Sequence, residues 1–179
     1  MWNRRKGAGM DLNEKRSALD DRLRELGSVI VAYSGGVDSA YLAWAAHQVM
    51  GDRMVAALAD SPSLPRSHYR DAVTFAEEQR IPLLVLQTQE LEHEAYAVNH
   101  GDRCFHCKDE LFTVLEAQRV RRGLACVAYG LNLDDGRDFR PGQKAAQEHR
   151  VVAPLAEAGL TKADDPATAR GLCARYIGN

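Results

Sequence analysis

The segment 34–39, with the sequence SGGVDS, constrains the fold of this chain more than any other feature because of what flanks it. On one side, residues 29–33 form a short apolar run rich in β-branched side chains, which is typical of a strand buried on both faces of a parallel sheet. On the other side, residues 39–50 are rich in good helix formers and stop before Gly51. The segment therefore joins a buried strand to the start of a helix.

A strand–turn–helix junction of this kind is well suited to binding phosphate. The backbone N–H groups of the turn and the positive end of the helix dipole point at one spot. Gly35 and Gly36 let the main chain approach an anion without an intervening Cβ, and two serines add hydroxyl donors. We therefore predict a polyphosphate site made by Ser34, Gly35, Gly36, Val37, Asp38 and Ser39.

Other phosphate-binding motifs do not fit the segment. It lacks the Gly-Lys-Ser/Thr ending of a Walker A loop and the G-x-G-x-x-G pattern of a dinucleotide site. No acidic residue closes the next strand in the way that reads an NAD ribose, although Asp60 lies close to that position. The non-functional alternative is a Ser/Gly turn that only connects a strand to a helix.

The rest of the chain repeats the alternation of strand and helix. Helices are predicted at about 11–26, 65–79 and 105–122, and strands at 54–59, 83–86, 124–129 and, very short, 151–152. This order predicts an α/β fold with a doubly wound, mostly parallel, five-stranded sheet and helices on both faces. Ligands of such sheets bind at the carboxyl ends of the strands, where Asp60, Ser61 and Gly130 also fall.

Composition narrows the class of protein. With 179 residues, 45% of them hydrophobic, and a net charge of −2, we expect one domain over residues 11–179 after a disordered leader over residues 1–10. The near-neutral charge argues against nucleic acid as a partner. The sequence has no apolar run long enough for a membrane helix and no signal-peptide pattern, so we expect a cytoplasmic protein. We also expect a homo-oligomer that acts on a small nucleotide-type substrate.

A second candidate site is the C-x-x-C pair Cys104 and Cys107, near the predicted start of a helix. The helix dipole, together with Arg103 and Lys108, favours the thiolate form, and the spacing also suits a metal ion or an iron–sulfur cluster. Two thiols leave such a site incomplete, because zinc usually has four ligands and a cluster three or four. Two ordinary reduced thiols at a helix start are the alternative.

The strand followed by SGGVDS resembles the PP-loop of the ATP pyrophosphatases, which cleave ATP between the α- and β-phosphates and adenylylate a substrate. Three further stretches, DRCFHCKDELF, GLNLDDGRDFRPG and APLAEAGLTK, resemble the LarE family of ATP-dependent sacrificial sulfur transferases. The likeness covers most of residues 28–162. It implies an adenine nucleotide alpha-hydrolase-like fold, with ATP and Mg²⁺ as cofactors.

The resemblance also implies roles for single residues. By the resemblance, Asp38 and Ser39 are expected to be catalytic residues of the PP-loop, with Asp38 positioning Mg²⁺ or the loop rather than acting as a base. The nucleotide meets the main chain of Ala59, Asp60 and Ser61, and Gly130 lines the cleft beside it. Cys104 and Cys107 are two ligands of a [4Fe–4S] cluster, as in the family members that carry one. Asp134, Asp135 and Asp138 are further candidates for holding Mg²⁺, with a solvated acidic loop as the alternative.

The chain departs from the LarE pattern after residue 162. Family members continue to a segment of the type Pro-Ala-Ser-x-Cys-Leu-x-Ser-Arg and a further small domain, whereas this sequence ends at Asn179. We therefore expect the C-terminal part to be lacking. Cys173 stands in a different context, so the resemblance assigns no third cluster ligand, and Leu131 stands where family members usually carry Thr.

The function expected from these features is adenylylation of a substrate carboxylate by ATP, with release of pyrophosphate, followed by sulfur transfer. Two alternatives stay open. One is another PP-loop ligase or thiolase, of the NAD-synthetase or tRNA-thiolating kind, although the low basic charge argues against tRNA. The other is a truncated, non-catalytic nucleotide-binding protein.

Overall fold

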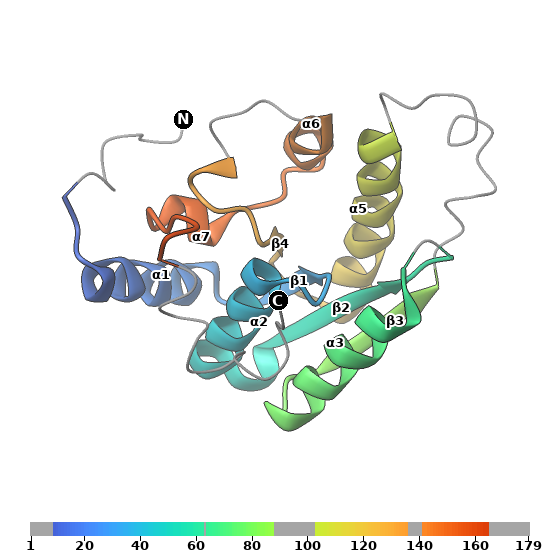
Figure 1. The fold of residues 1–179 in the computed structure, drawn as a ribbon, viewed down its shortest axis with the longest axis horizontal. Coiled ribbons are helices and arrows are strands. Elements are labelled where there is room, and N and C mark those ends of the chain that lie inside the picture. Colours follow the sequence, from blue (N-terminus) through green and yellow to red (C-terminus); the bar gives the residue numbers. More distant parts are fainter. Residues whose placement is uncertain (1–8, 63, 88–102, 136–140, 165–179) are drawn as a thin grey trace.

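A computed structural model describes residues 9–62, 64–87, 103–135 and 141–164, which form one parallel sheet covered by helices (Figure 1). The elements are, in chain order, α1 (Leu12–Leu26), β1 (Val29–Tyr33), α2 (Val37–Met50), the 3₁₀ turn η1 (Gly51–Arg53), β2 (Met54–Asp60), α3 (Arg66–Glu78), β3 (Leu83–Gln87), α5 (Arg103–Arg122), β4 (Cys126–Tyr129), α6 (Pro141–Glu148) and α7 (Pro154–Glu157). In this described part of the chain, no helix combines the length and apolar character needed to cross a bilayer.

The four strands lie in the order β3-β2-β1-β4, and every neighbouring pair is parallel. β1 is one of the two inner strands, because Val29 is in register with Met54 on one side and with Cys126 on the other. All five residues of β1 are buried, as its run of β-branched side chains predicts. β3 is an edge strand, and its Val85 is 38% exposed.

The prediction of a fifth strand at residues 151–152 is wrong. Val152 makes only an isolated parallel bridge with Ala128. Its backbone N–H donates to Val127 O over 2.9 Å, and Tyr129 N donates to Val152 O over 3.1 Å. The pairing cannot continue, because α7 begins at Pro154, which has no N–H to donate.

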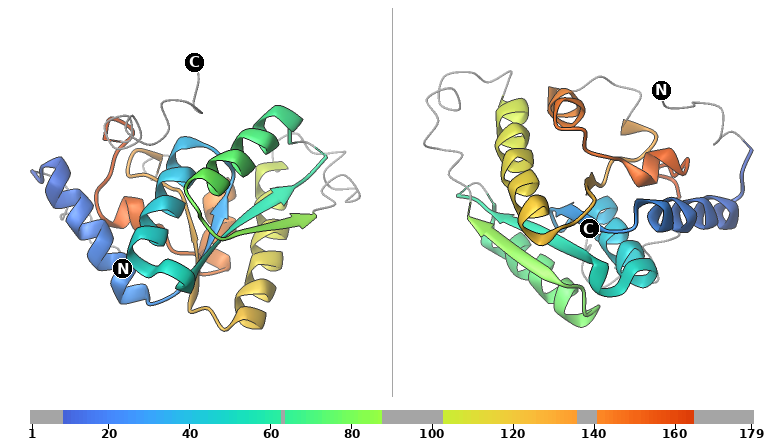
Figure 2. Two further views of the ribbon diagram at one scale, coloured as in Figure 1. Left: turned by 90° about the horizontal axis from the view of Figure 1, so that it is seen from below. Right: turned by 180° about the vertical axis from the view of Figure 1, so that it is seen from behind.

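Helices cover both faces of the sheet, so the predicted doubly wound arrangement is confirmed. Alternate side chains of β1 supply the two cores. Val29, Val31 and Tyr33 pack with α1, α2, α3 and α7. Ile30 and Ala32 pack with α5 and α6 on the opposite face. The left view of Figure 2 shows α2 and α3 in front of the strands and α5 behind them.

The boundaries of α1, α2, α3 and α5 lie within two residues of those predicted, whereas α6 and α7 were not predicted. α1 begins with a capping box, in which the Asp11 side chain accepts from Asn13 N and Glu14 N, and the Glu14 side chain accepts from Asp11 N. It ends at Gly27, which has a φ of +75°. These short-range bonds need no tertiary partner, so the sequence predicts them well.

The chain leaves β1 toward one face of the sheet and reaches β4 from the other. α2 follows β1 and packs on the first face, whereas α5 precedes β4 and packs on the second. β1 and β4 are nevertheless neighbours. Such a switch point leaves a crevice at the carboxyl ends of the strands, which is where open α/β sheets bind their ligands.

Candidate nucleotide-binding cleft

The loop after β1 is held in shape by its own two serines. Ser39 Oγ donates to Gly36 O over 3.0 Å and lies 3.0 Å from Ser34 Oγ. The backbone N–H of Ser34 donates to Ser39 Oγ over 3.1 Å, and that of Gly36 donates to Ser34 Oγ over 3.3 Å. All four bonds join residues of the same hexapeptide, so the local sequence stabilises the turn.

The two glycines of this loop contribute different things. Gly35 has a φ of +79°, a conformation that favours glycine, and a Cβ there would lie 2.7 Å from Ala72 Cβ on α3. Gly36 has an ordinary φ of −72°, and the nearest atom to a Cβ there is Ser34 Oγ, at 3.4 Å. Gly35 is therefore required by the fold, whereas Gly36 leaves the backbone open to an approaching anion.

α2 begins at this loop without a side-chain cap. Gly36 is the N-cap residue, and its carbonyl accepts the first helical bond, from Ala40 N, over 2.9 Å. The N–H groups of the first turn have no acceptor within the helix. They lie at the positive end of the helix dipole and are suited to bind phosphate oxygens.

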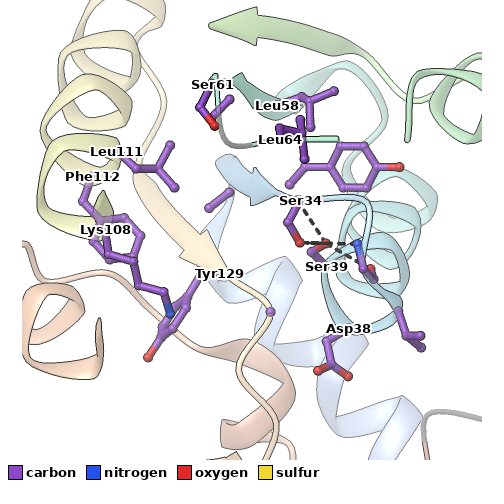
Figure 3. A pocket seen from close by; sticks show the side chains of 16 residues that line it. Ser34, Asp38, Ser39, Leu58, Ser61, Leu64, Lys108, Leu111, Phe112 and Tyr129 are labelled. Atoms are coloured by element: carbon purple, nitrogen blue, oxygen red, sulfur yellow. Dashed lines mark hydrogen bonds between the residues drawn. The ribbon is translucent and has the colours of Figure 1, made fainter. Parts of the chain in front are cut away.

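An open cleft of about 400 Å³ lies beside the loop, at the carboxyl ends of β1, β2 and β4 (Figure 3). Its volume is within the range of small-molecule sites. Gly130, at the end of β4, closes this cleft against α2, because a Cβ there would lie 2.7 Å from Ser39 N. The predicted site residues that line the cleft are Ser34, Gly36, Val37, Asp38, Ser39, Ala59, Ser61 and Gly130.

The loop after β2 is held by one arginine. The Asp60 carboxylate is not part of the cleft lining; it accepts from Arg66 over 2.6 Å and from Gln87 Nε2 over 3.0 Å. The bond from Arg66, and next that from Gln87, lowers the pKa of Asp60. Arg66 also donates to the carbonyls of Ser61, over 3.3 Å, and Leu64, over 3.0 Å. Ser61 and Leu64 thereby stay on the cleft wall.

The opposite wall comes from α5 and β4. Lys108, Leu111 and Phe112 line it together with Tyr129. Lys108 Nζ lies 5.5 Å from the centroid of the Tyr129 ring, and the Phe112 ring meets that ring edge-on at 5.8 Å. Burial, and to a smaller extent Asp135, raises the pKa of Tyr129 to about 12. Of the described residues that line the cleft, Lys108 alone carries a positive charge.

Asp38 is the one carboxylate among the described residues that line the cleft. One of its oxygens accepts a hydrogen bond from Asn132 Nδ2 over 3.2 Å. In the described part of the chain, no three His, Cys, Asp or Glu side chains gather as a metal site. A Mg²⁺ ion that arrives with ATP needs only one or two carboxylates, because the phosphates supply further oxygens. The position of Asp38 fits that requirement.

Asp134 and Asp135, the further candidates for Mg²⁺, face Lys162 instead. The backbone N–H of Lys162 donates to Asp134 Oδ2 over 3.0 Å, and Lys162 Nζ lies 2.8 Å from Asp135 Oδ1. Neither carboxylate lines the cleft. Asp138, the third candidate, lies outside the described residues.

The cysteines are placed in three ways. Cys104 and Cys107 lie in the first turns of α5, which begins two residues before its predicted start, and their side chains are outside the description. Cys173 is outside it altogether. Lys108, which follows the pair, lines the cleft, so this part of α5 adjoins it. Cys126 is half-buried in β4, where burial raises the pKa of its thiol.

The sequence-based prediction missed the α5 wall of the cleft. A signal was present, because Lys108, Leu111 and Phe112 have the spacing of one helical face. That spacing does not reveal which element the face meets. The strand order, with β4 beside β1, places it opposite the phosphate loop.

Residues 12–125 match the NAD synthase family. The chain belongs to this family, whose members share PP-loop chemistry of the ATP pyrophosphatase type. It is 39% identical over 151 residues to the uncharacterized protein slr1717 of Synechocystis sp. The aligned region covers 84% of this chain and 56% of that protein. It is 30% identical over 162 residues to pyridinium-3,5-bisthiocarboxylic acid mononucleotide synthase of Lactiplantibacillus plantarum. The aligned region covers 90% of this chain and 59% of that enzyme.

These matches confirm the resemblance to the sulfur transferases, and the chain spans less than two thirds of the length of either relative. A solved structure agrees in fold. The NH₃-dependent NAD synthetase of Campylobacter jejuni superposes with a TM-score of 0.72 and 16% identity, over 93% of this chain and 75% of that one. The predicted α/β class is thereby confirmed.

Proposed function

We propose that this protein binds ATP in the cleft and transfers the adenylyl group to a carboxylate of a small nucleotide-type substrate. The observation that carries the proposal is the uncapped start of α2, which opens with Gly36 and Asp38 onto the cleft. A helix start of this kind binds phosphate through its N–H groups and dipole. Membership of the NAD synthase family supports ATP as the nucleotide.

The phosphate side of the cleft suits the departure of pyrophosphate. An oxygen of the substrate carboxylate attacks the α-phosphorus, and the bond from that phosphorus to the oxygen bridging to the β-phosphate breaks. Pyrophosphate leaves with the electron pair, and the N–H groups at the start of α2 stabilise its charge. Mg²⁺, when bound at Asp38, neutralises part of the phosphate charge. No proton has to move, because the attacking group is already ionised.

The other two sides of the cleft suit the base and the acceptor. The adenine lies against the main chain of Ala59 and Ser61 and the apolar side chain of Leu64. Lys108, on the opposite wall, attracts the carboxylate of the acceptor. An acceptor of the pyridinium dicarboxylate mononucleotide type is supported by the relative whose name is pyridinium-3,5-bisthiocarboxylic acid mononucleotide synthase.

Product analysis tests this proposal. The full chain is incubated with ATP, Mg²⁺ and pyridinium-3,5-dicarboxylate mononucleotide, and the nucleotides are separated by mass spectrometry. Pyrophosphate is expected in an amount equal to the sum of the substrate adenylate and the AMP that water releases from it, and Asp38→Ala is expected to abolish all three. ADP and phosphate would overturn the assignment. ATP binding without turnover would instead indicate a non-catalytic nucleotide-binding protein.

Sulfur transfer is the proposed second step. Hydrosulfide-level sulfur attacks the carbonyl carbon of the adenylate, the bond to the AMP oxygen breaks, and AMP leaves with the electron pair. Cys104 and Cys107 are the proposed thiolate ligands of a [4Fe–4S] cluster, since their segment of α5 runs directly into the cleft-lining Lys108. Two thiolates fit a cluster only in part, because a cluster needs three or four ligands.

Iron and sulfide analysis after anaerobic reconstitution tests the cysteine pair. Little or labile iron is expected, and Cys104→Ser is expected to abolish it. Cys126→Ser is the matched control, because that thiol lies in β4 and its Sγ is 3.7 Å from Ser28 O. A stable cluster that survives Cys104→Ser would refute the ligand assignment, and zinc at the pair would redirect it to a structural site.

The family match favours one second candidate, the formation of an amide as in NAD synthetases. There ammonia, rather than sulfur, would attack the adenylate. The same incubation separates the two functions when the acceptor is replaced by deamido-NAD and ammonium is added. NAD as a product would establish the amide-forming reaction for this chain.

A further inference from the structure

Asn132 is a fully buried polar residue outside the cleft lining, in the loop after β4. Its Nδ2 donates to Asp38 Oδ2 over 3.2 Å, and its Oδ1 accepts from the backbone N–H of Asp135 over 3.0 Å. The orientation of the amide follows from these partners. A backbone N–H can only face the amide oxygen, and a carboxylate can only accept from the amide NH₂ group. Asn132 therefore joins the acidic loop to the start of α2 by a directional contact.

The loop that carries Asn132 is anchored on both sides. Leu131 O accepts from Ala156 N over 3.1 Å, and Leu133 N donates to Leu160 O over 2.7 Å. These bonds hold the backbone on either side of the amide, so the side chain has little freedom to follow a moving partner. Gly130, two residues earlier, lies so close to α2 that a Cβ there would be 2.7 Å from Ser39 N. The amide is thus held in place, and its hydrogen bond fixes the direction of the Asp38 carboxylate.

The direction of the Asp38 carboxylate matters because Asp38 lies in the first turn of α2. A carboxylate in the first turn of a helix is attracted to the same N–H groups that bind phosphate. In Figure 3 the Asp38 carboxylate points away from the hydroxyl groups of Ser34 and Ser39. The bond from Asn132 accounts for this direction. It keeps one negative group off the phosphate site and leaves the second oxygen for a cation.

We propose that Asn132 is a positioning residue that holds the Asp38 carboxylate off the phosphate-binding N–H groups and aims it at the Mg²⁺ of Mg·ATP. This inference rests on the proposed function, because it assumes that ATP binds at the start of α2. The donor is what matters in this role. A side chain of the same size without the NH₂ group cannot replace Asn132.

Asn132→Asp removes the donor and adds one negative charge, and it keeps the shape and the acceptor for Asp135 N. At neutral pH the introduced carboxylate faces Asp38 and repels it. The ratio of ATP affinities with and without Mg²⁺, measured by calorimetry, is expected to fall about tenfold to hundredfold, the usual cost of losing a group that orients a metal ligand. The control Asn13→Asp adds the same charge to the exposed start of α1 and is expected to leave the ratio unchanged.

A wild-type ratio in Asn132→Asp at neutral pH would overturn the proposal.

The double variant Asp38→Asn with Asn132→Asp covers the case in which the single variant does not fold. It restores one donor, one acceptor and one charge, so its melting temperature is expected to be near that of the wild type. Its carboxylate is buried away from the cleft, so the Mg²⁺ effect is expected to be lost; a wild-type effect would overturn the proposal. If Mg·ATP binding depends on Asn132 but no AMP forms, the proposed function fails and the positioning role stands. If the wild type does not bind ATP, both fail.

Discussion

The two sides of the cleft are built in different ways. The phosphate side, residues 34–39, is polar, and its hydrogen bonds join residues no more than five positions apart. The α5 side, formed by Lys108, Leu111, Phe112 and Tyr129, is apolar apart from one cation. The residues of this side come from α5 and β4, which pack together in the second core of the sheet.

This difference predicts that the two sides of the cleft affect different binding steps. The phosphate side presents backbone N–H groups whose geometry is set locally, so its suitability for phosphate does not depend on the opposite wall. The α5 side presents side chains whose positions depend on the packing of α5 against β4. We therefore expect substitutions on the phosphate side to change ATP affinity, and substitutions on the α5 side to change the use of the acceptor.

The largest effect is expected from Gly36→Val. The added side chain occupies the open space through which the phosphates reach the backbone, and ATP affinity is expected to fall about a hundredfold, on the order of two lost charge-assisted hydrogen bonds. Calorimetry measures the affinity. The melting temperature is expected to hold, because a Cβ at Gly36 meets Ser34 Oγ at an ordinary 3.4 Å. Unchanged affinity in a folded variant would refute the phosphate site.

Gly35→Ala is expected to act on the fold instead. It forces a side chain into a backbone with φ +79° and within 2.7 Å of Ala72 Cβ, which should lower the free energy of unfolding by about 1–3 kcal/mol. Urea unfolding measures this change. Gly36→Ala is the matched control, with an expected change below about 0.5 kcal/mol. Adding Ala72→Gly to Gly35→Ala should recover part of the loss, and equal losses in the two single variants would contradict the distinction between the glycines.

Lys108→Met probes the α5 side. Removing the one cation among the described lining residues should raise KM for a carboxylate acceptor about tenfold, the cost of one charge-assisted contact, while ATP affinity without acceptor stays within about twofold. Steady-state kinetics and calorimetry separate the two effects. Lys144→Met, on the exposed part of α6, is the charge-matched control. A drop in ATP affinity as large as the rise in KM would break the proposed division between the two sides.

The smallest effect concerns Tyr129, whose ring belongs to the α5 side. Burial raises its pKa from 10.0 to about 12, so the neutral phenol is favoured in the folded state. Its contribution to stability is complete below pH 10 and is lost as the pH rises toward 12. Ultraviolet titration of the tyrosinate absorbance should lose a late-titrating component in Tyr129→Phe. If Tyr129→Phe instead loses a component that titrates at lower pH, the Tyr129 ring is exposed to solvent.

Sequence reasoning was strongest where a bond or a pattern is local. The bounds of α1 and the turn around Ser34 were predicted, and both depend on bonds between residues a few positions apart. The prediction of a strand at residues 151–152 failed because an apolar pair has the pattern of a short strand. Only the structure shows that a helix begins at Pro154 and ends the pairing. The partners of Lys108 and Asn132 could not be predicted, because they lie 21 and 94 positions away in the sequence.

Residues 29–50 alone predict that a buried strand runs into a helix through a turn that exposes backbone N–H groups, and the proposed phosphate site depends on this turn. The reason is that glycine conformation, serine hydrogen bonds and helix propensity act over a few residues. What surrounds the turn depends on the tertiary fold. The order β3-β2-β1-β4 brings β4 beside β1, so that Tyr129 and α5 face the phosphate loop and Asn132 reaches Asp38. Strand order is settled by packing across the whole sheet, and no short stretch of sequence encodes it.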